Sequence, residues 1–147
     1  MAAKRSQRLG VVLMLAERHE QEAADYLARH QKLVDEQRQK ASELADYRTG
    51  YVEQYAGAQS GMRPEELSRY SQFIQQLGDA IKQQESAVAQ LIEQLVKLRQ
   101  HWHGQHLRRR AIEDLITRLR KGEDQAAERQ LQKQLDDMAQ AAGKRPL

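Results

Sequence analysis

Apolar residues recur along the first part of the chain at alternating intervals of four and three residues. The run extends from Leu9 to Tyr55, and ten of its fourteen positions are apolar. Its members are Leu9, Leu13, Ala16, Glu20, Ala23, Leu27, His30, Val34, Gln37, Ala41, Leu44, Arg48, Tyr51 and Tyr55. Because this alternation keeps one stripe of a helix facing a partner, it predicts the seam of a coiled coil.

A second ladder with the same spacing runs from Tyr70 to Leu119, and twelve of its fifteen positions are apolar. Its members are Tyr70, Ile74, Leu77, Ile81, Gln84, Val88, Leu91, Leu95, Leu98, Trp102, Gln105, Arg109, Ile112, Ile116 and Leu119. Near Gly122 the spacing slips by one residue. It resumes at Ala127, Leu131, Gln134, Met138 and Ala142, which is a stutter in the coiled-coil repeat.

Gly57, Gly61 and Pro64 lie between the two ladders and predict the one turn of the chain. Two long helices joined by a short turn run antiparallel. We therefore predict an all-α fold, a long antiparallel two-helix coiled coil or helical hairpin with a C-terminal overhang. The expected organisation is a single coiled-coil domain over residues 1–147, with helix 1 at about 6–56, a turn at about 57–63, helix 2 at about 64–141 and a flexible C-terminal tail at 142–147.

The turn also sets which residues should face each other. With its centre near residue 60, residue i should face roughly residue 120 minus i, and residues beyond about 112 should overhang. The polar ladder positions are expected to set the register or to face water. In the first ladder these positions are Glu20, His30, Gln37 and Arg48.

The composition favours an elongated helical protein over a globule, since 31% of residues are charged and only 5% are aromatic. The absence of cysteine excludes disulfides and thiolate chemistry, and is typical of a reducing compartment. The apolar segment 9–16 is interrupted by Gly10 and followed by Glu17 and Arg18. It is too short for a membrane span or a signal peptide, so we expect a cytoplasmic protein.

Three of the five histidines lie in the stretch HWHGQHLRRR at residues 101–110. On a helix His101 and His103 point about 200° apart, so they cannot share a metal ion. His103 and His106 could share a metal ion, but two histidines are fewer than the three or four ligands that zinc usually has. We therefore expect no metal site and no cofactor.

No motif indicates catalysis. The chain has no Gly-rich phosphate loop, no nucleophile elbow and no cysteine. A two-helix rod also offers no cavity in which water is excluded and the pKa of a carboxylate is shifted. We predict a non-enzymatic protein with no catalytic residue and no small-molecule substrate.

The net charge of +3 is unevenly distributed. The window from Lys97 to Lys121 holds eight basic and two acidic residues, which indicates a partner-facing region. Its arginines Arg108, Arg109, Arg110, Arg118 and Arg120 could contact phosphates. Aromatic platforms for base stacking are absent apart from Trp102, so a nucleic-acid-binding hairpin is the less favoured alternative.

The aromatic residues gather on either side of the turn. The aromatic residues of the chain are one Trp, five Tyr and one Phe. Most of them lie near the turn, namely Tyr47, Tyr51, Tyr55, Tyr70 and Phe73. A hairpin would bring them together, and Tyr47 and Phe73 lie off the ladders. They are therefore expected to form an exposed patch, which is typical of a docking site, although packing near a turn is an open alternative.

The sequence resembles the FliJ proteins of the bacterial flagellar type III export apparatus. The residues that carry the resemblance are Leu44-Ala45-Asp46-Tyr47 followed by Tyr51, the block YSQFIQQL at 70–77 with Ala80-Ile81, and the tail LDDMAQAAGKRP at 135–146. The resemblance implies a cytosolic antiparallel coiled coil, similar to the central stalk of rotary ATPases, that links a hexameric export ATPase to the membrane export gate. It also implies an escort that binds export chaperones, located peripherally at the inner membrane.

The family's gate-binding surface maps onto Leu44, Tyr47, Tyr51, Phe73, Leu77 and Ala80. Two positions depart from the family pattern, since Lys40 stands where a glutamine is expected and Gln84 where a histidine is expected. The five arginines named above suit the inside of an ATPase ring, where they could pair with carboxylates. A coiled-coil adaptor or scaffold without an ATPase partner would show the same periodicity and is the alternative.

Overall fold

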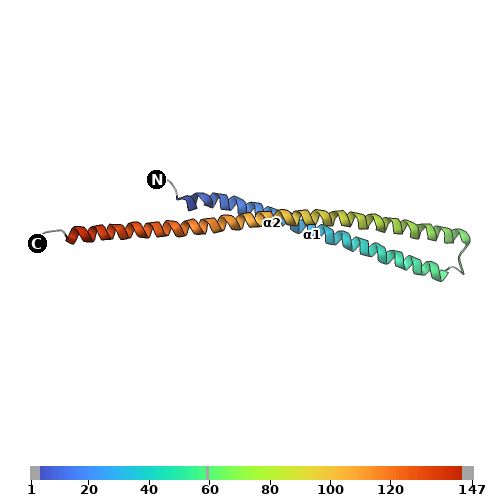
Figure 1. Ribbon diagram of the computed structural model, residues 1–147. Helices are drawn as coiled ribbons and strands as arrows, with labels where there is room; N and C mark the ends of the chain where they lie inside the picture. Colours follow the sequence, from blue (N-terminus) through green and yellow to red (C-terminus); the bar gives the residue numbers. More distant parts are fainter. Residues whose placement is uncertain (1–3, 59, 144–147) are drawn as a thin grey trace. The chain divides into compact units, whose positions relative to one another are not determined.

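The chain forms two long α-helices, α1 at Arg5–Ala58 and α2 at Pro64–Gly143 (Figure 1). The computed structural model describes residues 4–58 and 60–143, and these residues contain no strand. The helices pack against each other, which confirms the predicted helical hairpin. The sequence pattern predicted helices at 6–56 and 64–141. Of the expected tail, Ala142 and Gly143 belong to α2, and residues 144–147 lie outside the described residues.

The turn follows from local chemistry. The Gly61 amide donates to the Ala58 carbonyl over 3.1 Å, which closes the end of α1. Pro64 opens α2, a position that suits its fixed φ and its missing N–H. Two carboxylates, Glu65 and Glu66, lie in the first turn of α2, where they complement the helix dipole.

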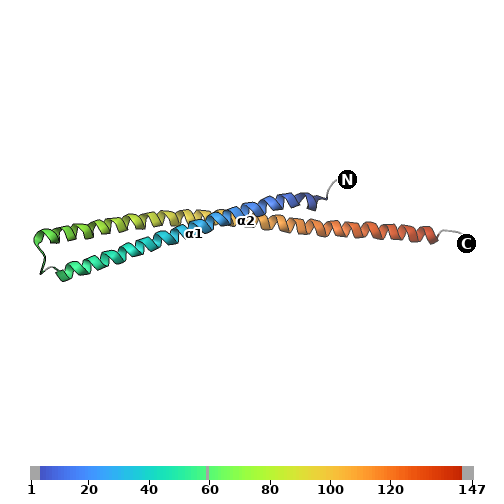
Figure 2. The same cartoon turned by 180° about the vertical axis from the view of Figure 1, so that it is seen from behind.

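Contacts group the residues into two units, of which Ala23–Trp102 contains the turn. In this unit α1 and α2 lie side by side and antiparallel (Figure 2). The most enclosed residue is Val34, which is fully buried. The other buried apolar residues of this unit are Ala23, Leu77, Val88 and Leu95, and all of them lie on the predicted ladders.

Polar ladder positions of this unit bond across the seam. The His30 Nε2 atom lies 2.8 Å from the Leu91 carbonyl oxygen and, since a carbonyl only accepts, donates to it. The Gln84 amide donates to the Gln37 side-chain oxygen over 2.7 Å and to its carbonyl oxygen over 3.1 Å. These pairs tie one residue of α1 to one residue of α2, as is expected of register-setting positions.

The second unit comprises residues 4–22 and 103–143 of the described chain. Its buried apolar residues are Ala16 and Ile116, and both are ladder residues. Ser6 is buried as well, and its Oγ donates to a Glu123 carboxylate oxygen over 2.6 Å. Every described residue after Glu123 is exposed, so α2 does overhang.

The predicted facing rule needs a correction in this unit. It placed Ser6 opposite residue 114 and began the overhang at about 112, whereas Ser6 contacts Glu123. Side chains on a helix lean toward its N-terminus. In an antiparallel pair the two side chains therefore lean in opposite directions, and a residue of α1 meets a residue further along α2 than the backbone alone indicates.

Candidate functional site

Aromatic rings from both helices meet beside the turn. The ring centres of Tyr47 and Tyr51 lie 4.9 Å apart, and those of Tyr51 and Phe73 lie 4.8 Å apart, both in edge-on geometry. Tyr70 continues the cluster, with its ring centre 5.6 Å from that of Tyr51 and 6.2 Å from that of Tyr55. The five aromatic residues that the sequence placed near the turn are therefore one contiguous cluster.

Hydrogen bonds fix the tyrosine hydroxyls of this cluster. The Tyr47 and Tyr51 hydroxyl oxygens lie 3.3 Å apart, and the Tyr70 hydroxyl donates to the Gln54 side-chain oxygen over 2.7 Å. The hydrogen bond with Tyr47 raises the pKa of Tyr51 above its ordinary value. The Tyr51 hydroxyl thus stays protonated at neutral pH and offers a hydrogen-bonding group.

We use the term aromatic surface for Leu44, Tyr47, Tyr51, Phe73, Leu77 and Ala80. Tyr47 is 54% exposed and Phe73 is 38% exposed, so these two rings face solvent. Leu77 is buried, and the other three residues are half-buried. Both exposed rings pack against Tyr51, which is a ladder residue.

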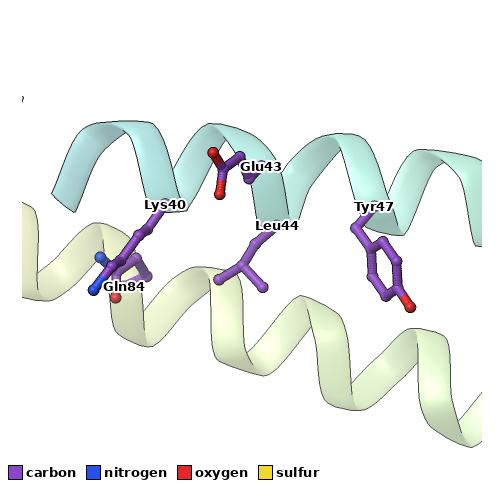
Figure 3. A pocket seen from close by; sticks show the side chains of 5 residues that line it. All are labelled: Lys40, Glu43, Leu44, Tyr47 and Gln84. Carbon is purple, nitrogen blue, oxygen red and sulfur yellow. The ribbon is translucent and has the colours of Figure 1, made fainter. Parts of the chain in front are cut away.

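An open pocket of about 350 Å³ adjoins the aromatic surface (Figure 3). It is lined by Lys40, Glu43, Leu44 and Tyr47 from α1 and by Gln84 from α2. Figure 3 shows Leu44 pointing toward α2 and the Lys40 side chain extending beside Gln84. The two positions that differ from the family pattern thus line the same pocket.

The five arginines of the basic window have different surroundings. Arg108, Arg110, Arg118 and Arg120 are exposed. The Arg109 side chain is only 20% exposed and bonds to carboxylates on both helices. The structure therefore brings four of the five predicted residues to the surface and places the fifth in the seam.

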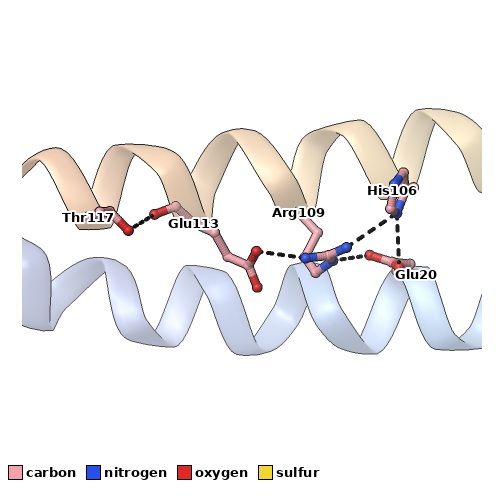
Figure 4. A network of polar contacts seen from close by, with 5 residues as sticks. All are labelled: Glu20, His106, Arg109, Glu113 and Thr117. Atoms are coloured by element: carbon pink, nitrogen blue, oxygen red, sulfur yellow. Dashed lines mark hydrogen bonds and ion pairs between the residues drawn. The ribbon is translucent and has the colours of Figure 1, made fainter.

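Arg109 belongs to a polar network that crosses the seam (Figure 4). Its Nε donates to a carboxylate oxygen of Glu20 on α1, and its Nη1 donates to Glu113 on α2 over 2.7 Å. The His106 Nδ1 lies 3.2 Å from the other Glu20 oxygen. The sequence pattern did not predict this network. The available signal was that Glu20 and Arg109 are polar residues at ladder positions that are otherwise mostly apolar.

Charge in this network is mutually stabilised. The hydrogen bond from Arg109 lowers the pKa of Glu20, and the hydrogen bond to Glu20 raises the pKa of Arg109. Both groups therefore carry their full charge at neutral pH. The network joins the two helices at ladder positions that apolar residues usually occupy. Arg109 therefore stabilises the helix pair whether or not a partner is bound.

Comparison with known families identifies the chain. Residues 5–147 match the family described as flagellar FliJ protein. The chain belongs to the FliJ family. This family consists of non-enzymatic flagellar proteins with a role related to flagellar export, so the predicted resemblance is confirmed. No curated protein and no solved structure matches the chain significantly.

Two further observations concern this FliJ-family chain. Over residues 4–58 and 60–143, neither helix is long and apolar enough to cross a bilayer. In the same residues, no three histidine or carboxylate side chains gather closely enough to hold a metal ion. In the network of Glu20, His106 and Arg109, the Arg109 guanidinium bonds to the Glu20 carboxylate across the two helices and contacts His106 within α2.

Proposed function

We propose that this FliJ-family chain is a non-catalytic stalk that couples the hexameric flagellar export ATPase to the membrane export gate. It also escorts export chaperones, and it works in the cytoplasm, peripherally at the inner membrane. The match to the FliJ family over residues 5–147 carries the proposal. A helical hairpin supports it, because a rod can contact one partner along one segment and a second partner along another.

The aromatic surface is the proposed contact with the cytoplasmic domain of the export gate. Its six residues are Leu44, Tyr47, Tyr51, Phe73, Leu77 and Ala80. Tyr47 and Phe73 support this assignment, because large exposed aromatic residues on a packed base are typical binding hot spots. The buried Leu77 would act by supporting the rings from beneath.

The basic window is the proposed contact with the ATPase, through Arg108, Arg109, Arg110, Arg118 and Arg120. Exposed guanidinium groups suit bidentate pairing with carboxylates on the inner face of a ring. Because Glu20 and Glu113 already engage Arg109, we expect the four exposed arginines to supply most of the binding energy. Arg109 would hold the helices so that its neighbours are presented.

Binding to the isolated gate domain tests the aromatic assignment. Tyr47→Ala and Phe73→Ala should each weaken the affinity by about tenfold or more, since hot-spot truncation costs about 2 kcal/mol. Both side chains are exposed, so helicity by circular dichroism should not change. Tyr26→Ala is the matched control, because Tyr26 is 60% exposed and lies outside the surface. Wild-type affinity in both aromatic variants would remove the gate from this surface.

A further inference from the structure

A groove runs between the helices on one flank of the unit Ala23–Trp102. It encloses about 400 Å³ and is lined by Ala24, Leu27, Ala28, Gln31, Arg99 and Trp102. None of these residues belongs to the aromatic surface or to the five arginines of the basic window. Only Leu27 and Trp102 lie on the predicted ladders, so the groove borders the seam without replacing it.

Small side chains create this groove. Ala24 and Ala28 are one helical turn apart on α1, so both leave room on the same face. Across from them, Trp102 supplies a large apolar wall. On α2, Ile92 and Val96 precede Arg99 at intervals that place all three on one face, and Val96 is 46% exposed. The groove is therefore continued along α2 by an apolar strip that is partly exposed to solvent.

Arg99 gives the groove its charge. It is the only charged residue in the lining, and its Nη2 donates to the Gln31 side-chain oxygen over 3.2 Å. This bond spans the two helices and holds the guanidinium over the groove. A guanidinium has five donors, so Arg99 keeps donors for a further acceptor, which a carboxylate fits best.

We propose that this groove binds an amphipathic helix of a partner protein, with apolar residues against Leu27 and Trp102 and a carboxylate on Arg99. Docking converts the two-helix segment into a local three-helix bundle, which buries apolar surface that the hairpin alone exposes. The inference goes beyond the proposed contacts with gate and ATPase, because it uses different residues and a different kind of partner surface.

The occupant follows from size and charge. A small molecule would leave the strip from Ile92 to Trp102 largely uncovered, whereas a helix has the length and the spaced side chains to cover it. An anionic lipid surface could neutralise Arg99, but it is flat and cannot enter a groove between helices. The groove therefore selects a helix whose polar flank carries glutamate or aspartate.

Trp102 makes docking directly observable, because it is the only tryptophan of the chain. The probes are two synthetic amphipathic peptides of about 20 residues without tryptophan, identical except that one carries glutamates and the other lysines beside its apolar stripe. With the full-length protein, the glutamate peptide should shift Trp102 emission to shorter wavelength in a saturable manner. The lysine peptide should bind about tenfold more weakly or not at all.

Two variants assign the response to the groove. Arg99→Glu should exchange the preference, so that the lysine peptide binds and the glutamate peptide does not. Ala28→Gln fills the groove and should remove binding of both peptides. Neither position is on a ladder, so helicity should be unchanged. Lys97→Glu is the matched charge reversal at an exposed position on another face of α2 and should behave as wild type.

Three results would overturn the proposal. They are an equal Trp102 response to both peptides, a preference for the glutamate peptide retained in Arg99→Glu, and no response up to about 1 mM peptide. Sedimentation of the protein alone covers one more case. A dimer that Ala28→Gln abolishes would make a second copy of this chain the occupant and would exclude the partner helix. None of these results depends on gate or ATPase binding, so they test the groove independently of the proposed coupling between ATPase and gate.

Discussion

At the scale of single residues, polar side chains decide how the two helices are matched. Apolar ladder residues pack equally well after a shift of one repeat, whereas Gln37 and Gln84 bond only in one register. Glu20 and Arg109 do the same in the other unit, with full charges on both partners. A seam with fewer polar residues would be more stable in total and less specific in its register.

The Glu20 carboxylate should make stability depend on pH. Its folded-state pKa is lowered, so its stabilising contribution is complete above the ordinary glutamate pKa of about 4.3 and is lost as the pH falls through the lower folded value. Glu20→Gln should therefore lower the thermal midpoint by a few degrees at about pH 7. The difference from wild type should be smaller at about pH 3. A difference that is the same at both pH values in circular dichroism melts would exclude this role for the ion pair.

Gly104 should limit helix stability without contributing a contact. It lies inside α2, and a Cβ atom added there would meet nothing within 4 Å. Gly104→Ala should therefore stabilise the protein by about 0.5–1 kcal/mol in urea denaturation, through helix propensity alone. Gly61→Ala is the control, because Gly61 has the same open space but lies in the turn outside both helices. An equal gain at both sites would argue against a propensity effect.

At the scale of the helices, the heptad ladders predict almost all of the positions that lie in the seam. Every position of the second ladder is buried or half-buried, and in the first ladder only Arg48 is exposed. The apolar positions from Ala127 to Ala142 have similar spacing and are all exposed, because α1 begins at Arg5 and Ser6 already meets Glu123. Periodicity thus predicts which face of a helix is apolar, and the length of the opposing helix decides whether that face is covered.

Seam packing can be tested with two neighbouring residues. Leu95 is 5% exposed and lies on the ladder, whereas Val96 is 46% exposed. Leu95→Ala should destabilise the protein by about 2 kcal/mol, the low end of the usual range, since solvent can reach part of a two-helix seam. Val96→Ala should change stability by less than about 0.5 kcal/mol. Equal losses in the two variants would show that the seam is not the main apolar contact.

Two features of the candidate sites could not be predicted from the sequence. The groove beside Trp102 depends on Ala24 and Ala28, and small residues on a helix face give no signal until the opposing side chains are known. The bond between Glu20 and Arg109 depends on a register offset of several residues, which arises from the lean of long side chains. The aromatic cluster was predictable, because the turn alone fixes which residues lie beside it.

At the scale of the whole molecule, separate stretches of one hairpin have separate proposed tasks. The aromatic surface and the groove are formed by residues of the unit Ala23–Trp102, and the basic window lies mostly in the other unit. Each surface combines residues exposed to solvent with ladder residues that fix their positions. Partner binding at one surface should therefore leave the helices at the other surfaces intact, as a stalk with several partners requires.

In the proposed function, the chain acts on the export ATPase through its exposed arginines. The most direct measurement is ATP hydrolysis by the cognate export ATPase with wild-type protein, with Arg108→Glu/Arg110→Glu and with Arg63→Glu/Arg69→Glu. Arg109 is kept in all three proteins, because it bonds to Glu20 across the seam. The control pair consists of two exposed arginines near the turn, Arg63 directly before α2 and Arg69 within it. We expect the wild type and the control to stimulate ATP hydrolysis and Arg108→Glu/Arg110→Glu to lose this stimulation. Equal stimulation by all three proteins, or none by the wild type, would contradict the proposed function.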